Sequence, residues 1–213
     1  PMRHFALLFL LACAPDVAKD KPAATVAEPS TAPAAPAPTP SAEVNQLAAD
    51  FVPVPRKVDP ARSKVHALGA KITRQHLIEF PTFSGEISAQ KNFVDKIDVT
   101  VQVADLTTDV PKLVEHLKSP DFFDVAQFPT AHFVSTSVVA GEGGAQTVTG
   151  DMTLHGVTKS ISFPATIEFA GTDIKAHAEF SINRKDFGIV YPGKPDDLIQ
   201  DNVLLTLDLV AAP

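Results

Sequence analysis

Seven histidines and one cysteine are the residues in this chain best suited to metal binding or nucleophilic chemistry. The histidines do not recur at metal-ligand spacing, and the sequence holds no HExxH, CxxC, phosphate-binding loop or GxSxG element. The carboxylates are scattered over polar strand faces, where contact with water explains them. We therefore predict no catalytic residue and no metal site, and we expect that the chain is not an enzyme.

Four polar residues are candidates for the rim of a binding pocket. Lys71 shares a strand face with Val65, and an ammonium inside an apolar interior is costly unless it is paired or solvated. At a pocket mouth Lys71 would meet a phosphate or quinone oxygen, whereas at a plain strand end only its stem would be buried. His76 follows the same strand. Arg184 and Asp186 would either clamp a head group or form an ion pair that holds a turn.

Composition excludes several classes of function. The net charge of −7 and the pI near 5.4 leave no basic footprint for nucleic acid or anionic lipid headgroups. Hydrophobic residues make up 45% of the chain, which is enough for a real core, and a single cysteine rules out an intrachain disulfide. A chain of 213 residues has room for one large all-β domain or one ordinary domain with extra segments.

The amino terminus resembles a bacterial lipoprotein leader. An apolar run, residues 5–12, follows a weakly basic start and ends at Cys13 in the sequence Leu-Leu-Ala-Cys. We expect residues 1–13 to be a signal peptide with a lipobox, and Cys13 to carry the lipid that is the only link to a membrane. Ala14 rather than aspartate follows, which favours the outer membrane and a periplasm-facing lipoprotein. An ordinary secretory signal, giving an unanchored periplasmic or secreted protein, is the alternative.

Residues 14–55 are rich in alanine, proline and threonine. Such a segment buries too little apolar surface to offset the entropy of ordering it, and proline removes backbone donors. We predict a disordered tether whose ends lie roughly 35–40 Å apart as a flexible coil. The folded domain is expected over residues 56–213.

Strand-like alternation dominates the rest of the chain. In residues 97–103, for example, isoleucine and valine alternate with aspartate, threonine and glutamine, so one face is apolar. One apolar face per strand is typical of antiparallel sheets. We predict an all-β, eight-stranded antiparallel lipocalin-like barrel, with a sandwich as the alternative. The expected strands lie at 64–74, 80–89, 97–103, 130–139, 145–154, 161–169, 174–182 and 205–209.

A short helical insertion is expected between the third and fourth strands. The apolar residues Val110, Leu113, Val114 and Leu117 recur at helical spacing, after Thr108 or Asp109 as the N-cap. A second short helix would begin at Asp121 and end before Pro129. These segments would cover one end of the barrel, either as a plug of the core or as a lid over a ligand.

The apolar face of the strands is expected to point inward. A transmembrane barrel would turn it outward and carry aromatic girdles, but the chain has no tryptophan and one tyrosine. The inward set includes small residues, which leave volume that a packed core would not tolerate. These residues are Ala67, Gly69, Gly150, Ala165, Ala176 and Ala178. Either a long apolar ligand or neighbouring phenylalanine rings would occupy that volume.

Several separated motifs resemble the YceI-like, polyisoprenoid-binding family across residues 56–213. They are the hairpin at 147–159, the Asn-Arg-Lys-Asp-Phe-Gly turn within 181–189, and the segments 58–65, 80–87 and 115–125. The resemblance implies a lipocalin-like barrel that binds polyprenyl lipids or other long-chain amphiphiles, with no known enzymatic step. The first strand departs from the family pattern at residues 67–70, so the identity of the lipid is open.

The predicted function is non-enzymatic binding, sequestration or transport of a long-chain isoprenoid or related lipid in the bacterial envelope. No cofactor is expected beyond a bound polyprenyl lipid or quinone, and a homodimer is left open. A packed, ligand-free stress-response or interaction module is the alternative, and an enzyme acting on the lipid is a third. The predicted pocket consists of Val65, Ala67, Gly69, Val99, Val101, Val103, Leu117, Phe122, Phe123, Met152, Leu154, Phe163, Ala165, Ala176, Ala178 and Phe180.

Overall fold

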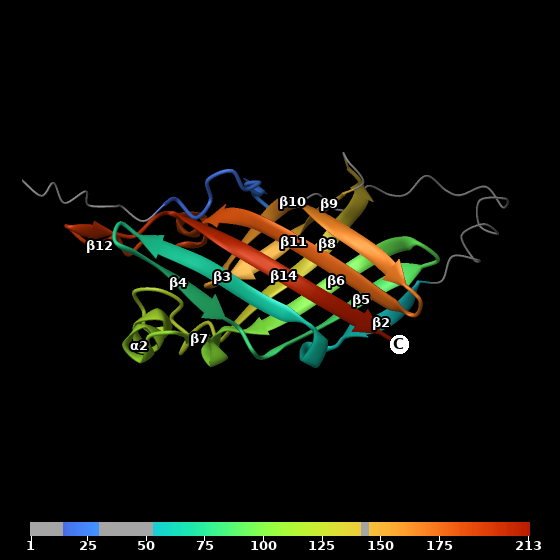
Figure 1. Cartoon of the computed structure of the whole chain (residues 1–213), viewed down its shortest axis with the longest axis horizontal. Coiled ribbons are helices and arrows are strands. Elements are labelled where there is room, and N and C mark those ends of the chain that lie inside the picture. The colour runs from blue at the N-terminus through green and yellow to red at the C-terminus, as the bar shows by residue number, and fades with distance from the viewer. Residues whose placement is uncertain (1–14, 30–52, 142–144) are drawn as a thin grey trace, which may run out of the picture.

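The computed structural model describes residues 15–29, 53–141 and 145–213 (Figure 1). The predicted signal peptide, Cys13 and residues 30–52 of the predicted tether lie outside these ranges. No helix in the described part of the chain has the length and apolar character needed to cross a bilayer.

Antiparallel strands make up most of the described chain. They are β1 (Thr25–Ala27), β2 (Val54–Val58), β3 (Lys64–Lys71), β4 (Arg74–Glu79), β5 (Phe83–Gln90), β6 (Phe93–Gln102), β7 (Thr107–Thr108), β8 (Thr130–Ala140), β9 (Gln146–Leu154), β10 (Val157–Ala170), β11 (Asp173–Asn183), β12 (Gly193–Lys194), β13 (Asp197–Leu198) and β14 (Asn202–Ala212). The helical elements are α2 (Pro111–Lys118) and the 3-10 turns η1 (Pro60–Arg62), η2 (Val103–Asp105) and η4 (Arg184–Phe187).

Eight of the described strands close into a barrel. The hydrogen-bonded ring runs β10–β9–β8–β6–β5–β2–β14–β11 and returns to β10. Strand β3 continues β2 after η1 and also pairs with β14, so the first strand of the barrel is bent rather than straight. The prediction of an eight-stranded antiparallel barrel with one short helical insertion is confirmed.

The alternation of residue types places one face of each strand inside this ring. Across β5 and β6, Ile97 lies opposite Ile87 and Val101 lies opposite Phe83, so apolar residues meet on the inner face. Between them Asp98 lies opposite Glu86 on the outer face, in contact with water. A shift of one residue would exchange the two faces, which is why the pattern specifies the register.

The expected strand at 64–74 ends at Lys71 and forms the first strand of a hairpin that continues to Glu79. Strands β3 and β4 pair from His66 with Glu79 to Lys71 with Arg74, and Ile72 and Thr73 form the turn. Both turn residues are β-branched, a type enriched in strands, and the turn carries no Asn-Gly or Asp-Gly signal. Strand β4 was therefore not predicted.

Helix α2 forms where expected, but its boundaries and its neighbour differ. Val110 is the N-cap residue, not Thr108 or Asp109. The predicted second helix is wrong, because residues 119–127 form hydrogen-bonded turns. The amides of Phe123 and Val125 donate to the last carbonyls of α2, at Leu117 and Lys118, so they close that helix instead of starting another.

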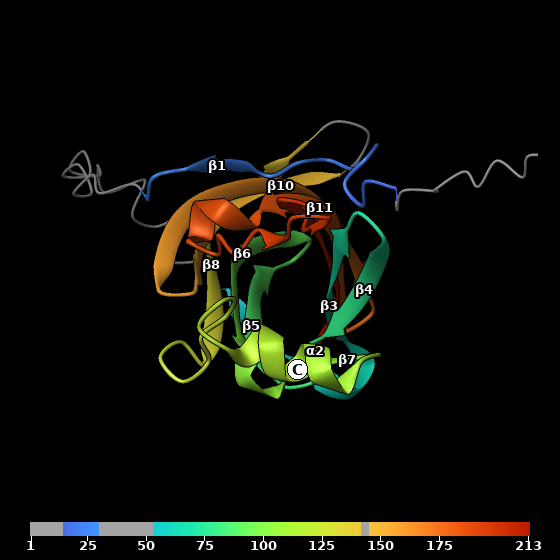
Figure 2. The ribbon, with the colours of Figure 1, turned by 90° about the vertical axis from the view of Figure 1, so that its left-hand side faces the viewer.

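Residues 15–29, which we name the N-terminal strap, lie against the barrel and are not a disordered tether. Strand β1 pairs with β10 at Ser160–Ser162, and Figure 2 shows it crossing the outside of β10. The edge of β10 is available there because its pairing with β11 begins only at Thr166, beyond Pro164. Proline has no amide hydrogen for a ladder bond, so the strap takes the place of β11 along this edge.

Candidate lipid-binding cavity

The barrel encloses a cavity of about 550 Å³. It lies toward the end where the β3–β4 turn, α2 and the β12–β13 hairpin meet, which is the end seen in Figure 2. All residues predicted for the pocket line it: Val65, Ala67, Gly69, Val99, Val101, Val103, Leu117, Phe122, Phe123, Met152, Leu154, Phe163, Ala165, Ala176, Ala178 and Phe180. Their contact with a lipid stays a prediction.

The two ends of the barrel differ in packing. At the far end Ile87, Ile174 and Ala211 are fully buried and do not line the cavity. In the hollow part, Met152 and Ala176 point inward yet are only half-buried, because the space in front of them is unfilled. The barrel is therefore packed at one end and hollow at the other.

Small residues contribute unequally to this hollow. A Cβ added to Gly69 would meet nothing closer than the Ile78 Cδ1 at 3.9 Å, so the glycine faces open space. Gly150 does not line the cavity, and a Cβ there would come within 2.6 Å of the Phe133 ring. The expectation that Gly150 adds volume is wrong, because the Phe133 ring and the backbone of β8 occupy its space.

Aromatic rings form part of the wall. Phe163 and Phe180 stack with their ring centres 4.0 Å apart and their planes 11° apart. Phe133 lies 5.6 Å from Phe163, and Phe123 meets Phe80 edge to face at 6.3 Å. Helix α2 and the turns after it also form part of the cavity wall, through Leu117, Phe122 and Phe123.

At the mouth, Lys71 forms an ion pair with Asp197 of β13. Asp197 also accepts hydrogen bonds from the hydroxyl of Thr73 at 2.9 Å and from its amide at 3.2 Å. The hydrogen bond from Lys71, followed by those from Thr73, holds the pKa of the Asp197 carboxyl below its usual value. Lys71 thus lines the cavity at its edge, with its charge paired and partly solvated.

His76 and His116 stand at the same end. The Nδ1 of His76 lies 3.0 Å from the Asp109 carboxylate, and this hydrogen bond lowers the pKa of Asp109. The His116 ring packs edge to face against Phe122 at 4.9 Å and Tyr191 at 5.1 Å. His116 and Tyr191 were not predicted for the pocket from the sequence. His116 could have been found from its position next to Leu117, which belongs to the apolar stripe of the helix.

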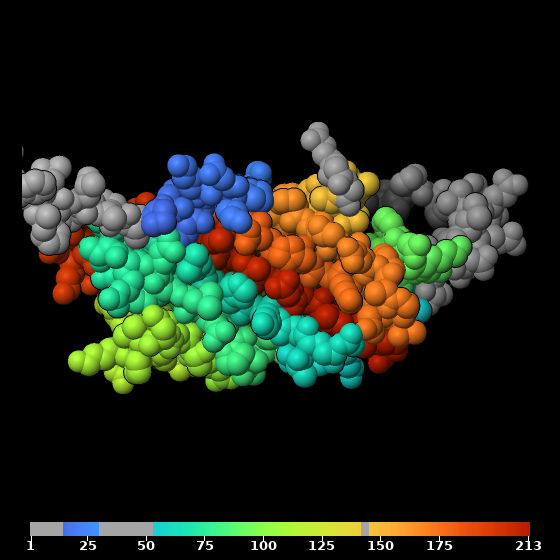
Figure 3. Space-filling model, viewed as in Figure 1, coloured from blue at the N-terminus to red at the C-terminus, as the bar shows by residue number. Residues whose placement is uncertain are grey.

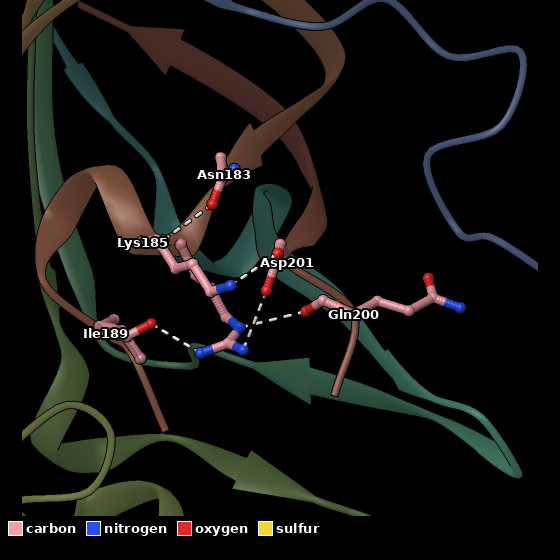
Figure 4. A network of polar contacts seen from close by, with 6 residues as sticks. Asn183, Lys185, Ile189, Gln200 and Asp201 are labelled. Atoms are coloured by element: carbon pink, nitrogen blue, oxygen red, sulfur yellow. Dashed lines mark hydrogen bonds and ion pairs between the residues drawn. The ribbon is translucent and has the colours of Figure 1, made fainter. Parts of the chain in front are cut away.

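Arg184 is buried, with 4% of its surface exposed, and it holds the mouth together (Figure 4). Its guanidinium donates to the carbonyls of Ile189 at 2.6 Å and Gln200 at 3.1 Å, and to Asp201 at 3.2 Å. Burial lowers the pKa of this guanidinium. Because protein oxygens already accept these hydrogen bonds, the arrangement is that of a structural lock.

Asp186 was predicted as the partner of Arg184, and this is wrong. Asp186 is exposed and does not line the cavity, whereas Asp201, the residue before β14, accepts from both Arg184 and Lys185. Residues two apart in a helical turn point in different directions, so residues 184 and 186 diverge in η4. The acceptor lies 17 residues farther along the chain, just before β14.

The hairpin turn at His155 supports the same region. His155 has a φ of 51°, and its Nδ1 lies 3.2 Å from the carbonyl of Phe187 in η4. Its ring packs against Phe128 at 5.0 Å. The two most distinctive sequence motifs, the hairpin and the Asn-Arg-Lys-Asp-Phe-Gly turn, therefore contact each other beside the cavity. Within the described ranges, no cluster of three or more potential metal ligands occurs.

The YceI-like domain model matches residues 57–211 of this chain. A UPF0312 protein of Pseudomonas putida strain F1 is 38% identical over 122 residues, which cover 54% of this chain and 64% of that relative. A UPF0312 protein of Pseudomonas syringae pv. tomato is 41% identical over 118 residues, covering 53% and 60%. The matched part is thus less than two thirds of the length of these relatives.

Two solved structures share the fold. BcnA of Burkholderia cenocepacia superposes with a TM-score of 0.63 at 24% identity, covering 73% of this chain and 99% of that one. A polyisoprenoid binding domain from Saccharophagus degradans, implicated in plant cell wall breakdown, superposes with a TM-score of 0.61 at 17% identity and covers 74% and 98%. At these identities the likeness establishes the barrel architecture.

Proposed function

Since this chain belongs to the YceI-like family, we propose that it binds one long-chain isoprenoid or related amphiphilic lipid inside the barrel, without catalysis. The cavity of about 550 Å³ is the observation that supports this most directly. Its volume falls in the range of roughly 300–1,000 Å³ that is usual for small-molecule sites. A fully packed, ligand-free module would have no such hollow, so the lipid-binding function is favoured over that alternative.

The binding would be passive. Each methylene of the tail that leaves water for the aliphatic and aromatic wall contributes about 0.8 kcal/mol, before the entropy cost of association. Among the polar residues of the lining, Lys71, His76 and Tyr191 lie at the mouth. We propose that the tail occupies the hollow and that a quinone, alcohol or phosphate head stays at this mouth.

We further propose that the protein sequesters or carries this lipid in the bacterial envelope, anchored through a lipid on Cys13 in the outer membrane. Replacing Cys13 by serine removes the attachment atom, so the C13S variant should move from the membrane fraction to the periplasmic fraction. Unchanged fractionation would refute the anchor while leaving the binding function standing.

Native mass spectrometry of protein purified from its host tests the binding function. We expect a mass excess that disappears on extraction with organic solvent and that matches a lipid recovered in the extract. The extracted protein, reloaded with that lipid, is the control for specific uptake. Repeated recovery of empty protein would contradict the proposal. The same spectrum gives the oligomeric state. To test for catalysis, the loaded protein is incubated, and the lipid should remain chemically unchanged.

A further inference from the structure

The N-terminal strap begins at the rim of the cavity. The carbonyl of Pro15 accepts hydrogen bonds from the side-chain amides of Gln75 at 3.0 Å and Gln200 at 3.5 Å. Gln75 lies between Arg74 and His76, which both line the cavity, and the amide of Gln200 donates to the Ala70 carbonyl at 2.8 Å. Pro15 is therefore held at the open end of the barrel, beside the β3–β4 turn.

The strap is fixed to the barrel along its length. Val17 is buried, and its amide donates to the side chain of Gln200 at 3.3 Å. Farther along, the amide of Ala24 donates to the Ser181 carbonyl at 2.8 Å, and the Ser181 amide donates to Pro22 at 2.9 Å. Figure 3 shows this blue segment lying flat on the barrel surface. Strap and barrel thus form one body.

Two ion pairs add to this attachment. Lys21 pairs with Glu179 of β11, and Glu28 pairs with Lys159 of β10. These pairs lie on either side of β1, which is hydrogen-bonded to β10 over its three residues. The strap is therefore attached at both of its ends and in its middle.

Cys13 precedes Pro15 by two residues, which span at most about 7 Å when fully extended. From this short distance we propose that the open end of the cavity faces the bilayer that carries the Cys13 lipid. The proposal rests on the lipid-binding function and on the anchor given above. The partner of this surface is the lipid bilayer itself, and a tail would pass between bilayer and cavity without crossing bulk water.

The side chains at this end suit an interface with lipid. Val190 and Leu198 are 63% and 46% exposed, and each lies one residue from a lining residue, Tyr191 and Ile199. Such residues enter the boundary between headgroups and acyl chains. Exposed apolar residues also occur at the far end, for example Phe93, so the position of the strap decides which end meets the membrane.

Fluorescence quenching of the lipidated full-length chain tests this orientation. The protein would be reconstituted in vesicles of phosphatidylethanolamine and phosphatidylglycerol that contain a lipid spin-labelled at its headgroup. A fluorophore is attached to K194C at the open end or to T172C in the β10–β11 turn at the far end. Cys13 has no free thiol once lipidated, so each added cysteine is the one labelling site. We expect at least threefold stronger quenching at position 194.

Two matched insertions show whether the strap causes this orientation. Twenty Gly-Ser residues between Ala14 and Pro15 add a coil of roughly 25 Å and should abolish the difference. The same insertion after Pro36, which lies beyond the strap, should leave the difference intact. Equal quenching at both ends without an insertion, or equal effects of the two insertions, would overturn the proposal.

Two further readouts separate this proposal from the others. A wild-type chain that does not fractionate with membranes would overturn the proposal together with the anchor. The lipid content of each preparation is measured alongside the quenching. Lipid-loaded protein with equal quenching at both ends refutes the orientation alone, whereas empty protein with the expected difference refutes the cargo alone.

Discussion

Replacing Ala176 by phenylalanine should weaken lipid binding by about 70-fold without lowering stability. Ala176 lies on β11 between Ile167 and Leu209, lines the cavity and is only half-buried. Its side chain faces open space, so a larger ring would enter the hollow instead of displacing a neighbour. The ring would then occupy volume that the lipid tail needs.

The magnitude follows from the apolar area that the ligand can no longer bury. A phenylalanine buries roughly 150–250 Å², and we take about 100 Å² of that as wall surface that the lipid tail no longer covers. At about 25 cal/mol per Å², this amounts to about 2.5 kcal/mol, or a factor of about 70 in Kd. Stability should hold or rise, because the new ring gains apolar burial in the folded state.

Titration of extracted protein with a farnesyl chain carrying a dansyl group measures the affinity, and urea denaturation measures stability. K175F is the matched control, because Lys175 is the adjacent residue on β11 and is exposed on the outer face. We expect the affinity of K175F to equal that of the wild type. Unchanged affinity in a stably folded A176F variant would refute the assignment of the cavity as the lipid site.

Three further predictions concern the mouth and the strap. Changing Arg184 to leucine leaves buried carbonyls without a donor and should cost roughly 3 kcal/mol in the free energy of unfolding, measured with urea. The pKa of Asp197 is lowered by Lys71, so the stability this pair contributes is present above the carboxyl's ordinary pKa and is lost as pH falls below it. The urea midpoint should therefore drop between pH 5 and pH 3 by less in D197N than in the wild type. Changing Ala24 to proline removes the donor to Ser181, and amide hydrogen exchange at residues 160–162 and 181 should accelerate.

Each of these has a control. K185L removes an exposed pair with Asp201 and should cost under about 1 kcal/mol, so equal losses for R184L and K185L would contradict the role of the buried guanidinium. D196N alters an exposed carboxyl beside Asp197. Its urea midpoint should drop between pH 5 and pH 3 by as much as that of the wild type. A24S keeps the amide, so faster exchange in A24S as well would mean that the Ala24 hydrogen bond does not hold the strap.

The barrel could be predicted because its strands each bury one face. The alternation of residues 97–103 admits one register once that face is apolar, and the small inward residues at 67, 69, 176 and 178 mark the hollow. Helix α2 could likewise be predicted from its apolar stripe. These features are local in sequence, so each could be found without knowing the rest of the fold.

Other features depend on partners that lie far away in the sequence. The strap has the composition of a tether, and it is ordered because β10 offers a free edge before Pro164 and β11 offers one at Ser181. Arg184 was paired with the nearest aspartate, Asp186, although Asp201 accepts its hydrogen bond. Local propensity cannot predict which acceptor Arg184 uses, because the path of the chain around the mouth determines which carboxylate lies within reach.

Gly69 and Gly150 show why composition alone does not locate a cavity. Both lie in strands, but only Gly69 faces the hollow, while Gly150 faces the Phe133 ring at 2.6 Å and the Ser135 Cα at 2.7 Å from an added Cβ. G69A should thus stay within about 0.5 kcal/mol of the wild type, and G150A should lose about 1–3 kcal/mol through overpacking. Urea denaturation of the two variants decides the matter, because equal losses would mean that the space beside Gly69 is filled in solution and that the hollow does not extend to β3.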